Sequence, residues 1–521
     1  MIYKDILIIG SGIAGLSFAL KIAKERPDLS ICILTKKSKT ESNTRYAQGG
    51  IAVVLDKITD SYQQHIDDTL KSGGGLCNKK IVRMVVKKAA ARLKELINWG
   101  VEFDKQTSGE FSTGLEGGHS HARILHHKDI TGFEIEKKLI LQISQYSNIT
   151  LLDNHFALDI ITTESIQNNI HINTCYGAYV LNQQDNSIKI FTSRITLLAT
   201  GGSGQVYQTT TNPSVATGDG VAIAQRAGAK IKDMQFVQFH PTAFYKINSN
   251  PSFLISEAVR GFGAWLVNKN GVRFVLDYDE RGELATRDIV SKAIYFELLK
   301  SHEDNVYLDC RHLDMKEFKK HFPSIYNHCK KNGIDLYKDQ IPVAPAAHYQ
   351  CGGISINAKA QTSIVNLYAC GECSHTGLHG SNRLASNSLL EAIVFSHEAY
   401  LHIFNKIDYV NKVPHLVFKK YPAKKANLSK INNLKKELKA LMNLYAGIVK
   451  TSEGLILAHK QLLKLDLLIK EKYQNVAPNY EIIELKNLMS VAHLIVNQSF
   501  KYINKRKINR NNEIETDINQ N

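Results

Sequence analysis

The first forty residues alternate between short apolar runs and a glycine-rich turn. Residues 5–9 (DILII) are almost entirely apolar, which is typical of a parallel strand buried on both faces. The sequence GSGIAG follows at 10–15, and apolar residues then recur at helical spacing through 16–23. A second apolar run occupies 31–34. This order predicts a strand, a tight turn, a helix and a second strand, the unit that binds dinucleotides.

The three glycines of this turn have separate physical roles. Gly10 permits the tight turn, Gly12 lets a pyrophosphate approach the backbone, and Gly15 lets the helix pack against the strand. The helix N-terminus then faces the phosphates, and the alternative is a glycine turn without a ligand. A ribose-binding carboxylate is expected at the end of the second strand, where the chain has Thr35 and Lys36. We therefore expect Lys36 to meet the phosphate or ribose region.

Two later glycine clusters indicate that the nucleotide domain is interrupted and then resumes. Residues 195–202 are again an apolar strand running into a glycine turn, and residues 367–372 end a strand with Glu372, placed to accept a sugar hydroxyl. We predict an α/β fold with a split Rossmann-like nucleotide domain, an inserted α+β cap and a C-terminal helical bundle. The expected boundaries are 1–235 and 348–410 for the nucleotide domain, 236–347 for the cap and 411–521 for the helices.

Composition fits a large globular protein with one unusual feature. The chain has 521 residues, 43% of them hydrophobic, and a net charge of +16, of which +11 falls within 411–521. Binding to nucleic acid or to an anionic membrane is one interpretation of this charge. The lysines alternate with apolar residues at helical spacing, which favours the solvated face of a helical bundle. We therefore expect no nucleic-acid or membrane partner.

Cysteine usage and targeting features predict a cytoplasmic protein without a metal. The eight cysteines are scattered, and neither a secretory leader nor an apolar stretch of about 18 residues is present. Cys370 and Cys373 have the spacing of a zinc or redox pair, but a structural zinc site needs four ligands and no second such pair exists. We expect no metal site.

Several longer motifs carry a family resemblance. They are NTRYAQGG at 43–50, GLEGGHSH at 114–121, QFHPTA at 238–243, SEAVRG at 256–261, DERGELATRD at 279–288, PAAHY at 345–349 and LHGSNRLASNSLLE at 378–391. Together they resemble the flavoprotein family that contains fumarate reductase, the succinate dehydrogenase flavoprotein and L-aspartate oxidase. The resemblance runs from about residue 3 to residue 500. It departs after Phe500, where the family's Ser-Arg-Gly-x-His stretch is absent.

Two positions separate the branches of this family. The dehydrogenase-type members commonly carry a histidine bonded covalently to FAD, and the matching residue here is Asn43, whose amide cannot form that bond. The segment around Glu116 resembles the L-aspartate oxidase branch, which has a carboxylate where the relatives that handle succinate and fumarate do not. The resemblance implies non-covalent FAD and L-aspartate oxidase chemistry. The alternative is a flavoprotein of the fumarate reductase or succinate dehydrogenase type.

The resemblance also implies a set of substrate residues. Two carboxylates and one ammonium group need cationic clamps and one anionic partner. Glu116 would orient the ammonium group, and Arg287 corresponds to the family's proton donor and acceptor, with Glu257 as a neighbour. The remaining substrate residues are His240, His348, Arg383 and Ser256. The alternative interpretation of Arg287 is a purely structural ion pair with the adjacent Asp288.

The cofactor would be held by many short segments. By resemblance, and including the glycine turn, the residues expected around FAD are Gly10, Ser11, Gly12, Ile13, Ala14, Gly15, Lys36, Asn43, Thr44, Arg45, Tyr46, Ala47, Gln48, Gly49, Gly50, Phe156, Ala157, Asp219, Glu372, Ser388 and Leu389. Residues 386–389 also predict an N-capped helix whose dipole would stabilise a reduced flavin.

The implied reaction transfers a hydride from the substrate Cα to FAD and produces iminoaspartate. O2, giving hydrogen peroxide, or fumarate would accept the electrons. The product would enter quinolinate formation by quinolinate synthase, in de novo NAD biosynthesis.

Overall fold

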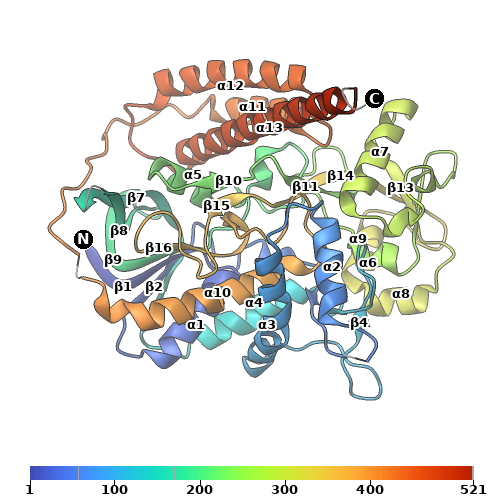
Figure 1. Ribbon diagram of the computed structural model, residues 1–521, viewed down its shortest axis with the longest axis horizontal. Coiled ribbons are helices and arrows are strands. Elements are labelled where there is room, and N and C mark those ends of the chain that lie inside the picture. The colour runs from blue at the N-terminus through green and yellow to red at the C-terminus, as the bar shows by residue number, and fades with distance from the viewer. Residues whose placement is uncertain (57, 168–169, 412, 519–521) are drawn as a thin grey trace.

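The computed structural model describes residues 1–56, 58–167, 170–411 and 413–518, and it has three packed regions (Figure 1). A sheet with helices lies at one end, the segment containing α6 to α9 forms the other end, and α11 to α13 lie along one side of both. In the described part of the chain, no helix is long and apolar enough to cross a membrane.

The largest sheet has the strand order β6-β2-β1-β9-β8-β7, with β16 also paired to β9. Its parallel part confirms the predicted nucleotide-binding topology, and β7 and β8 add an antiparallel hairpin. The strands are β1 (Ile2–Ile9), β2 (Ile31–Leu34), β6 (Ile149–Leu152), β7 (His155–Gln167), β8 (Ile170–Asn182), β9 (Ser187–Leu198) and β16 (Leu367–Ala369).

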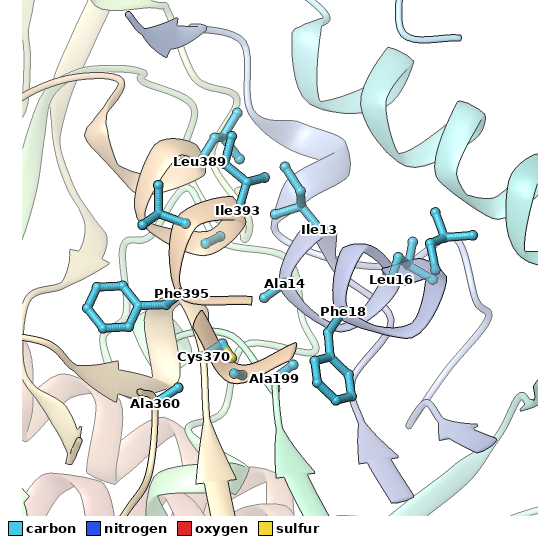
Figure 2. Packing of buried hydrophobic residues seen from close by; sticks show 14 of the residues in the cluster. Ile13, Ala14, Leu16, Phe18, Ala199, Ala360, Cys370, Leu389, Ile393 and Phe395 are labelled. Atoms are coloured by element: carbon cyan, nitrogen blue, oxygen red, sulfur yellow. The ribbon is translucent and has the colours of Figure 1, made fainter. Parts of the chain in front are cut away.

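Both faces of this sheet are covered because its central strands are apolar on both sides. Ile6 and Ile8 of β1 belong to the core formed with α1, α3, α4 and α10, whereas Leu7 and Ile9 belong to the core formed with α5 and the C-terminal helices. Ile13 and Ala14 of α1 lie near Leu389 and Ile393 of α10 (Figure 2). These helices are α1 (Ile13–Glu25), α3 (Lys79–Asn98), α4 (Thr131–Ile143), α5 (Asp219–Arg226) and α10 (Asn387–Lys406).

The glycine turn brings backbone segments too close together for side chains. Gly10 has a φ of +119°, and a Cβ there would lie 2.1 Å from the carbonyl oxygen of Ala199. A Cβ on Gly15 would lie 2.2 Å from the carbonyl oxygen of Gly10. The predicted roles of these two glycines in the turn and in helix packing therefore follow directly from the packing.

The segment predicted as a cap contains a four-stranded antiparallel sheet of order β11-β14-β13-β12. It has its own apolar core. Its strands are β11 (Val237–Phe244), β12 (Trp265–Val267), β13 (Val306–Asp309) and β14 (Ile341–Gln350), and its helices are α6 (Glu257–Gly261), α7 (Arg287–Ser301), α8 (Met315–His321) and α9 (Pro323–Lys331).

Smaller elements join these regions. They are β3 (Ile51–Ala52), α2 (Tyr62–Ser72), β4 (Thr113–Gly114), β5 (Ile124–Leu125), β10 (Ile231–Lys232), β15 (Gly353–Ser355), β17 (Ser374–His375) and the 3₁₀ turns Thr44–Tyr46, Gly204–Val206, Val275–Asp277, Gly282–Leu284, Gly371–Cys373 and Ile407–Tyr409.

The C-terminal helices confirm the predicted helical region. They are α11 (Ile431–Ala446), α12 (Ser452–Tyr473) and α13 (Tyr480–Ile518). Leu434, Leu438, Leu441 and Met442, which recur at helical spacing, are all buried in the core shared with the sheet. The bundle is therefore part of the main body of the protein.

Replacing one of these buried leucines should destabilise the whole core. Leu438 is fully buried, so Leu438→Ala should lower the free energy of unfolding by about 2–5 kcal/mol through lost burial and a residual cavity. Leu444 lies on the same helix with 70% of its surface exposed, and Leu444→Ala should change the free energy by no more than about 0.5 kcal/mol. Urea denaturation followed by circular dichroism measures both variants, and equal effects would contradict the packing of α11 described above.

Candidate active site and cofactor cleft

A cavity of about 550 Å³ lies at the carboxyl ends of β1, β9 and β16 and extends to the segment predicted as a cap. In open parallel sheets, ligands bind at this edge. Among the residues expected around FAD, Gly15 is the one that does not line the cavity, because it lies in α1 and packs against Gly10 of the turn and Ile8 of β1. All of the expected substrate residues, from Glu116 to Arg383, line it as well.

The cavity wall carries buried polar atoms that have no hydrogen-bond partner among the described residues. They are Asn43 Oδ1, Gln48 Oε1, Asp129 Oδ1, Thr200 Oγ1, Asn212 Oδ1, His240 Nε2 and Arg383 Nε. Buried polar groups are normally paired, since leaving them unpaired costs free energy. These atoms, together with the cradle at Gly10 and Gly12, fit a large polar ligand such as FAD.

Glu372 lies at the end of β16, where the sequence predicts a sugar-binding carboxylate. The amide of Asn43 donates to it at 2.8 Å, and the backbone NH of Gln350 donates at 3.0 Å. Burial raises the pKa of Glu372 to about 7. Because Asn43 uses its NH2 group on Glu372, its carbonyl oxygen remains for a ligand.

The predicted N-cap at the start of α10 is wrong in its bonding. The helix begins at Asn387 as expected, but Ser386 has a φ of +58° and its side chain accepts no hydrogen bond from a backbone NH of this helix. Its hydroxyl instead donates to Glu116 at 2.5 Å and accepts from the backbone NH of Gly50 at 3.1 Å. Ser388 and Leu389 in the first turn still line the cavity, so the start of the helix faces it.

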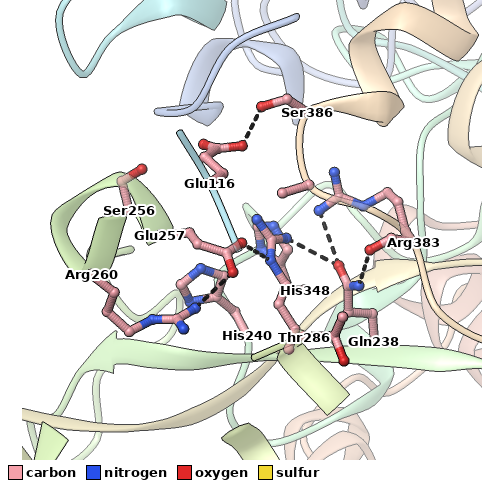
Figure 3. A network of polar contacts seen from close by, with 12 residues as sticks. Glu116, Gln238, His240, Ser256, Glu257, Arg260, Thr286, His348, Arg383 and Ser386 are labelled. Atoms are coloured by element: carbon pink, nitrogen blue, oxygen red, sulfur yellow. Dashed lines mark hydrogen bonds and ion pairs between the residues drawn. The ribbon is translucent and has the colours of Figure 1, made fainter. Parts of the chain in front are cut away.

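Two guanidinium groups, those of Arg287 and Arg383, share one neutral acceptor. Figure 3 labels this acceptor, Gln238, and one of its two donors, Arg383. Gln238 Oε1 accepts from Arg287 Nη1 at 3.0 Å and from Arg383 Nη2 at 3.1 Å. The side-chain amide of Gln238 is fixed in turn by Asn382 and by the carbonyl of Arg383. Arg287 also donates to Glu257 at 2.6 Å, so its main ion-pair partner is Glu257 and not the adjacent Asp288.

The buried charged groups shift one another's pKa values. Glu257 also accepts from Arg260 at 2.9 Å. Burial favours a higher pKa for Glu257, but Arg287 and Arg260 outweigh it and hold that pKa below its ordinary value. Burial and the neighbouring Arg287 lower the pKa of Arg383 to about 10. Three guanidinium groups thus surround one ionised carboxylate, which leaves excess positive charge for an anionic ligand.

Glu116 is fully buried on the same cavity wall. Burial, and next the charge of Glu257, raise the pKa of Glu116 above its ordinary value. The structure therefore places one acidic group beside the excess positive charge.

Two histidines and a serine complete the predicted set. The rings of His240 and His348 lie 5.1 Å apart, and burial followed by Arg287 keeps the pKa of each well below its usual value. The two imidazoles are consequently neutral at pH 7. Ser256 is the N-cap residue of α6 and also lines the cavity.

Sequence reasoning missed four polar residues that organise this site. Gln238, Arg260 and Tyr349 lie inside the motifs quoted above, so the sequence marked their segments. The role of each residue depends on a contact that the sequence does not reveal. The ring of Tyr349 lies 4.4 Å from the Arg383 guanidinium, and its hydroxyl donates to Glu391 at 2.9 Å. Ser386 is the fourth, through its bond to Glu116.

The cysteines show no bonded pair in the structure. All eight are free thiols, and burial raises the pKa of Cys370 and Cys373. In the described part of the chain, no group of three or more histidine, cysteine or acidic side chains is placed to hold a metal ion.

Comparison with known proteins agrees with this geometry. A family described as FAD binding domain matches residues 5–389. L-Aspartate oxidase of Yersinia pestis is 43% identical over 506 residues, which is 95% of this chain and 92% of that protein. The chloroplastic L-aspartate oxidase 2-a of Nicotiana tabacum is 41% identical over 522 residues, covering 95% and 79%. A quinol fumarate reductase structure from E. coli aligns with a TM-score of 0.86 and 30% identity, covering 96% and 88%. The chain therefore belongs to the L-aspartate oxidase family of FAD-binding flavoproteins.

Proposed function

We propose that this protein oxidises L-aspartate to iminoaspartate with non-covalently bound FAD. The observation that carries the proposal is the presence of both signs of charge in one cavity, with Arg287 and Arg383 beside the Glu116 carboxyl group. L-Aspartate has two carboxylates and one ammonium group, so its site needs both signs. Succinate and fumarate need the cations alone.

Arg383 suits a substrate carboxylate because no acidic side chain of the described residues forms an ion pair with it, whereas Arg287 is paired with Glu257. Arg383 donates to the uncharged oxygens of Gln238 and Ser388 and has an unpartnered Nε. A carboxylate would satisfy that atom with a charge-assisted bond. His240 Nε2 has no partner among the described residues either and can bond a carboxylate as a neutral imidazole.

Glu116 suits the ammonium group of the substrate. The Ser386 hydroxyl holds one carboxylate oxygen in place. A bound ammonium ion would favour the ionised form of a carboxyl group whose pKa is raised by burial. L-Aspartate and Glu116 would therefore stabilise each other's charged states.

Proton transfer is proposed to involve Arg287, with Glu257 as its neighbour. Arg287 Nε donates to one oxygen of Glu257, and Arg260 donates to the other. This contact gives Arg287 a partner for proton exchange, which an arginine needs because it is nearly always protonated. Bound FAD would supply the hydride acceptor for the substrate Cα.

The electrons would pass to O2, giving hydrogen peroxide, or to fumarate, whose two carboxylates fit the same cations. Iminoaspartate would be consumed by quinolinate synthase in de novo NAD biosynthesis. We further propose that the reaction takes place in the cytoplasm. The amide at Asn43, where the dehydrogenase branch has a histidine, supports non-covalent binding of the cofactor.

Anaerobic flavin bleaching tests the function directly. L-Aspartate should bleach the absorbance of the purified yellow protein, and succinate should not, because only L-aspartate pairs with Glu116. Acid precipitation should then release FAD into the supernatant. Bleaching by succinate alone would reassign the protein to the dehydrogenase type.

Replacing Glu116 should impair L-aspartate oxidation much more than fumarate reduction. Glu116→Gln removes the ammonium partner, so kcat/KM for L-aspartate should fall roughly 10- to 100-fold, the value of a charged hydrogen bond. Fumarate reduction should change far less, because fumarate has no ammonium group. Glu134→Gln, a buried carboxylate outside the cavity, is the control. Equal losses in both reactions would contradict the assignment.

Replacing Arg287 should remove turnover but not flavin. Arg287→Leu removes a carboxylate clamp and the proposed proton donor, so kcat should fall by about 100-fold or more. The flavin absorbance of the purified variant should match that of the unaltered protein. Arg281→Leu removes a nearby arginine that pairs with Asp279 outside the cavity, and it should keep nearly full activity. Turnover retained in Arg287→Leu would refute its catalytic role.

A further inference from the structure

One face of α13 contacts the segment where the sequence lacked its expected ribose-binding carboxylate. Tyr480, Glu484, Asn487 and Val491 recur at helical spacing, and each has a contact with Lys36 or with the start of α5. In Figure 1, α13 runs directly past α5. A single helix face from the C-terminal bundle therefore reaches the nucleotide domain at this point.

Lys36 is the centre of these contacts. Its ammonium group lies 2.8 Å from Asp219 Oδ2 and 3.0 Å from Glu484 Oε1, and it donates to Thr217 at 2.7 Å. The side chains of Lys36, Asp219 and Glu484 are 10%, 11% and 7% exposed. Two carboxylates from different regions thus meet one buried lysine.

The second oxygen of Asp219 is also held by α13. Asn487 donates to Asp219 Oδ1 at 2.8 Å. Next to Asp219, Gly218 has a φ of +72°, and a Cβ there would lie 2.5 Å from a methyl carbon of Val491. The helix is packed so closely against the start of α5 that Asp219 has little freedom to move.

The position of this network identifies which part of the cofactor it serves. Lys36 follows the second strand of the nucleotide-binding unit, where the adenosine ribose lies in dinucleotide folds. Lys36, Asp219 and Phe156 line the cavity, whereas Glu484 does not. Glu484 can therefore act on a ligand only through Lys36 and, beyond it, Asp219.

The charges in the network depend on one another. Burial lowers the pKa of a lysine, but Asp219 and Glu484 outweigh it and raise the pKa of Lys36. Burial likewise acts to raise the pKa of Glu484, but Lys36 and Lys435 lower it to about 2. Lys435 contacts the second oxygen of Glu484 at 2.8 Å. Without the charge of Glu484, Lys36 would have Asp219 as its only charged partner among the described residues, and it would compete more strongly with a ligand for that carboxylate.

We propose that Glu484 is a positioning residue for the adenosine end of FAD, so that the C-terminal helices complete the cofactor site. Glu484 neutralises part of the positive charge of Lys36. Asp219 is therefore less strongly engaged by Lys36 and remains able to accept ribose hydroxyls. Asp219 supplies, from α5, the carboxylate that the second strand lacks. The proposal rests on the FAD-binding part of the proposed function and not on the identity of the substrate.

Titration of the full-length apoprotein tests this role without measuring turnover. Glu484→Gln should raise the Kd for FAD about tenfold and the Kd for ADP by a similar factor, the effect of one disturbed polar contact. The Kd for FMN should stay within about twofold. FMN lacks the adenosine half, and the expected tenfold loss, about 1.4 kcal/mol, is confined to the part of the site that binds this half. The matched control is Glu481→Gln, one turn earlier on α13, for which all three constants should be unchanged. Flavin fluorescence measures FAD and FMN, and calorimetry measures ADP.

A double-mutant cycle separates positioning from general folding. If Glu484 acts through Lys36, then the double variant Glu484→Gln, Lys36→Met should have the same Kd for ADP as Lys36→Met alone. The melting temperature of the apoprotein checks that each variant is folded. An unchanged Kd for both FAD and ADP in Glu484→Gln would overturn the proposal, as would a parallel rise in the Kd for FMN. Because no substrate is present, these results are independent of whether L-aspartate is oxidised.

Discussion

The site depends on holding several guanidinium groups close together away from water. Arg260, Arg287 and Arg383 are all buried, and the carboxylate that contacts two of them is Glu257. Buried charge is costly unless it is paired and hydrogen-bonded. The surroundings meet this constraint with neutral groups, the oxygen of Gln238 and the ring of Tyr349. The remaining positive charge matches the two carboxylates of the proposed substrate.

This constraint explains why the site lies where separate parts of the chain meet. Glu257 and Arg260 come from α6 and Arg287 begins α7, whereas Arg383 and Glu116 come from segments outside the predicted cap. Neither group of segments contains the complete set of charges. The C-terminal bundle acts in the same way at the far end of the cavity, where α13 contacts Lys36 and Asp219. The regions are therefore joined by polar contacts at the site as well as by shared apolar cores.

Sequence reasoning succeeded where the signal was local. The apolar run of β1 and the glycines after it specify a buried strand and a tight turn through steric limits that involve few neighbours. It failed at Ser386, whose hydroxyl bonds Glu116, 270 residues away in the chain, and not the helix that it begins. It also passed over Gln238, because an uncharged residue gives no sign that it will join two arginines.

The sequence by itself determined the nucleotide-binding unit and the helical C-terminal region, since periodicity and glycine spacing are properties of neighbouring residues. Most other segments that line the cavity were expected from the family resemblance. Only the tertiary structure decided which polar groups pair. It matched Arg287 with Glu257 and not with Asp288, Ser386 with Glu116, and Lys36 with Glu484. The physical reason is that a hydrogen bond or ion pair requires its atoms within about 3 Å, and chain packing alone brings distant residues to that separation.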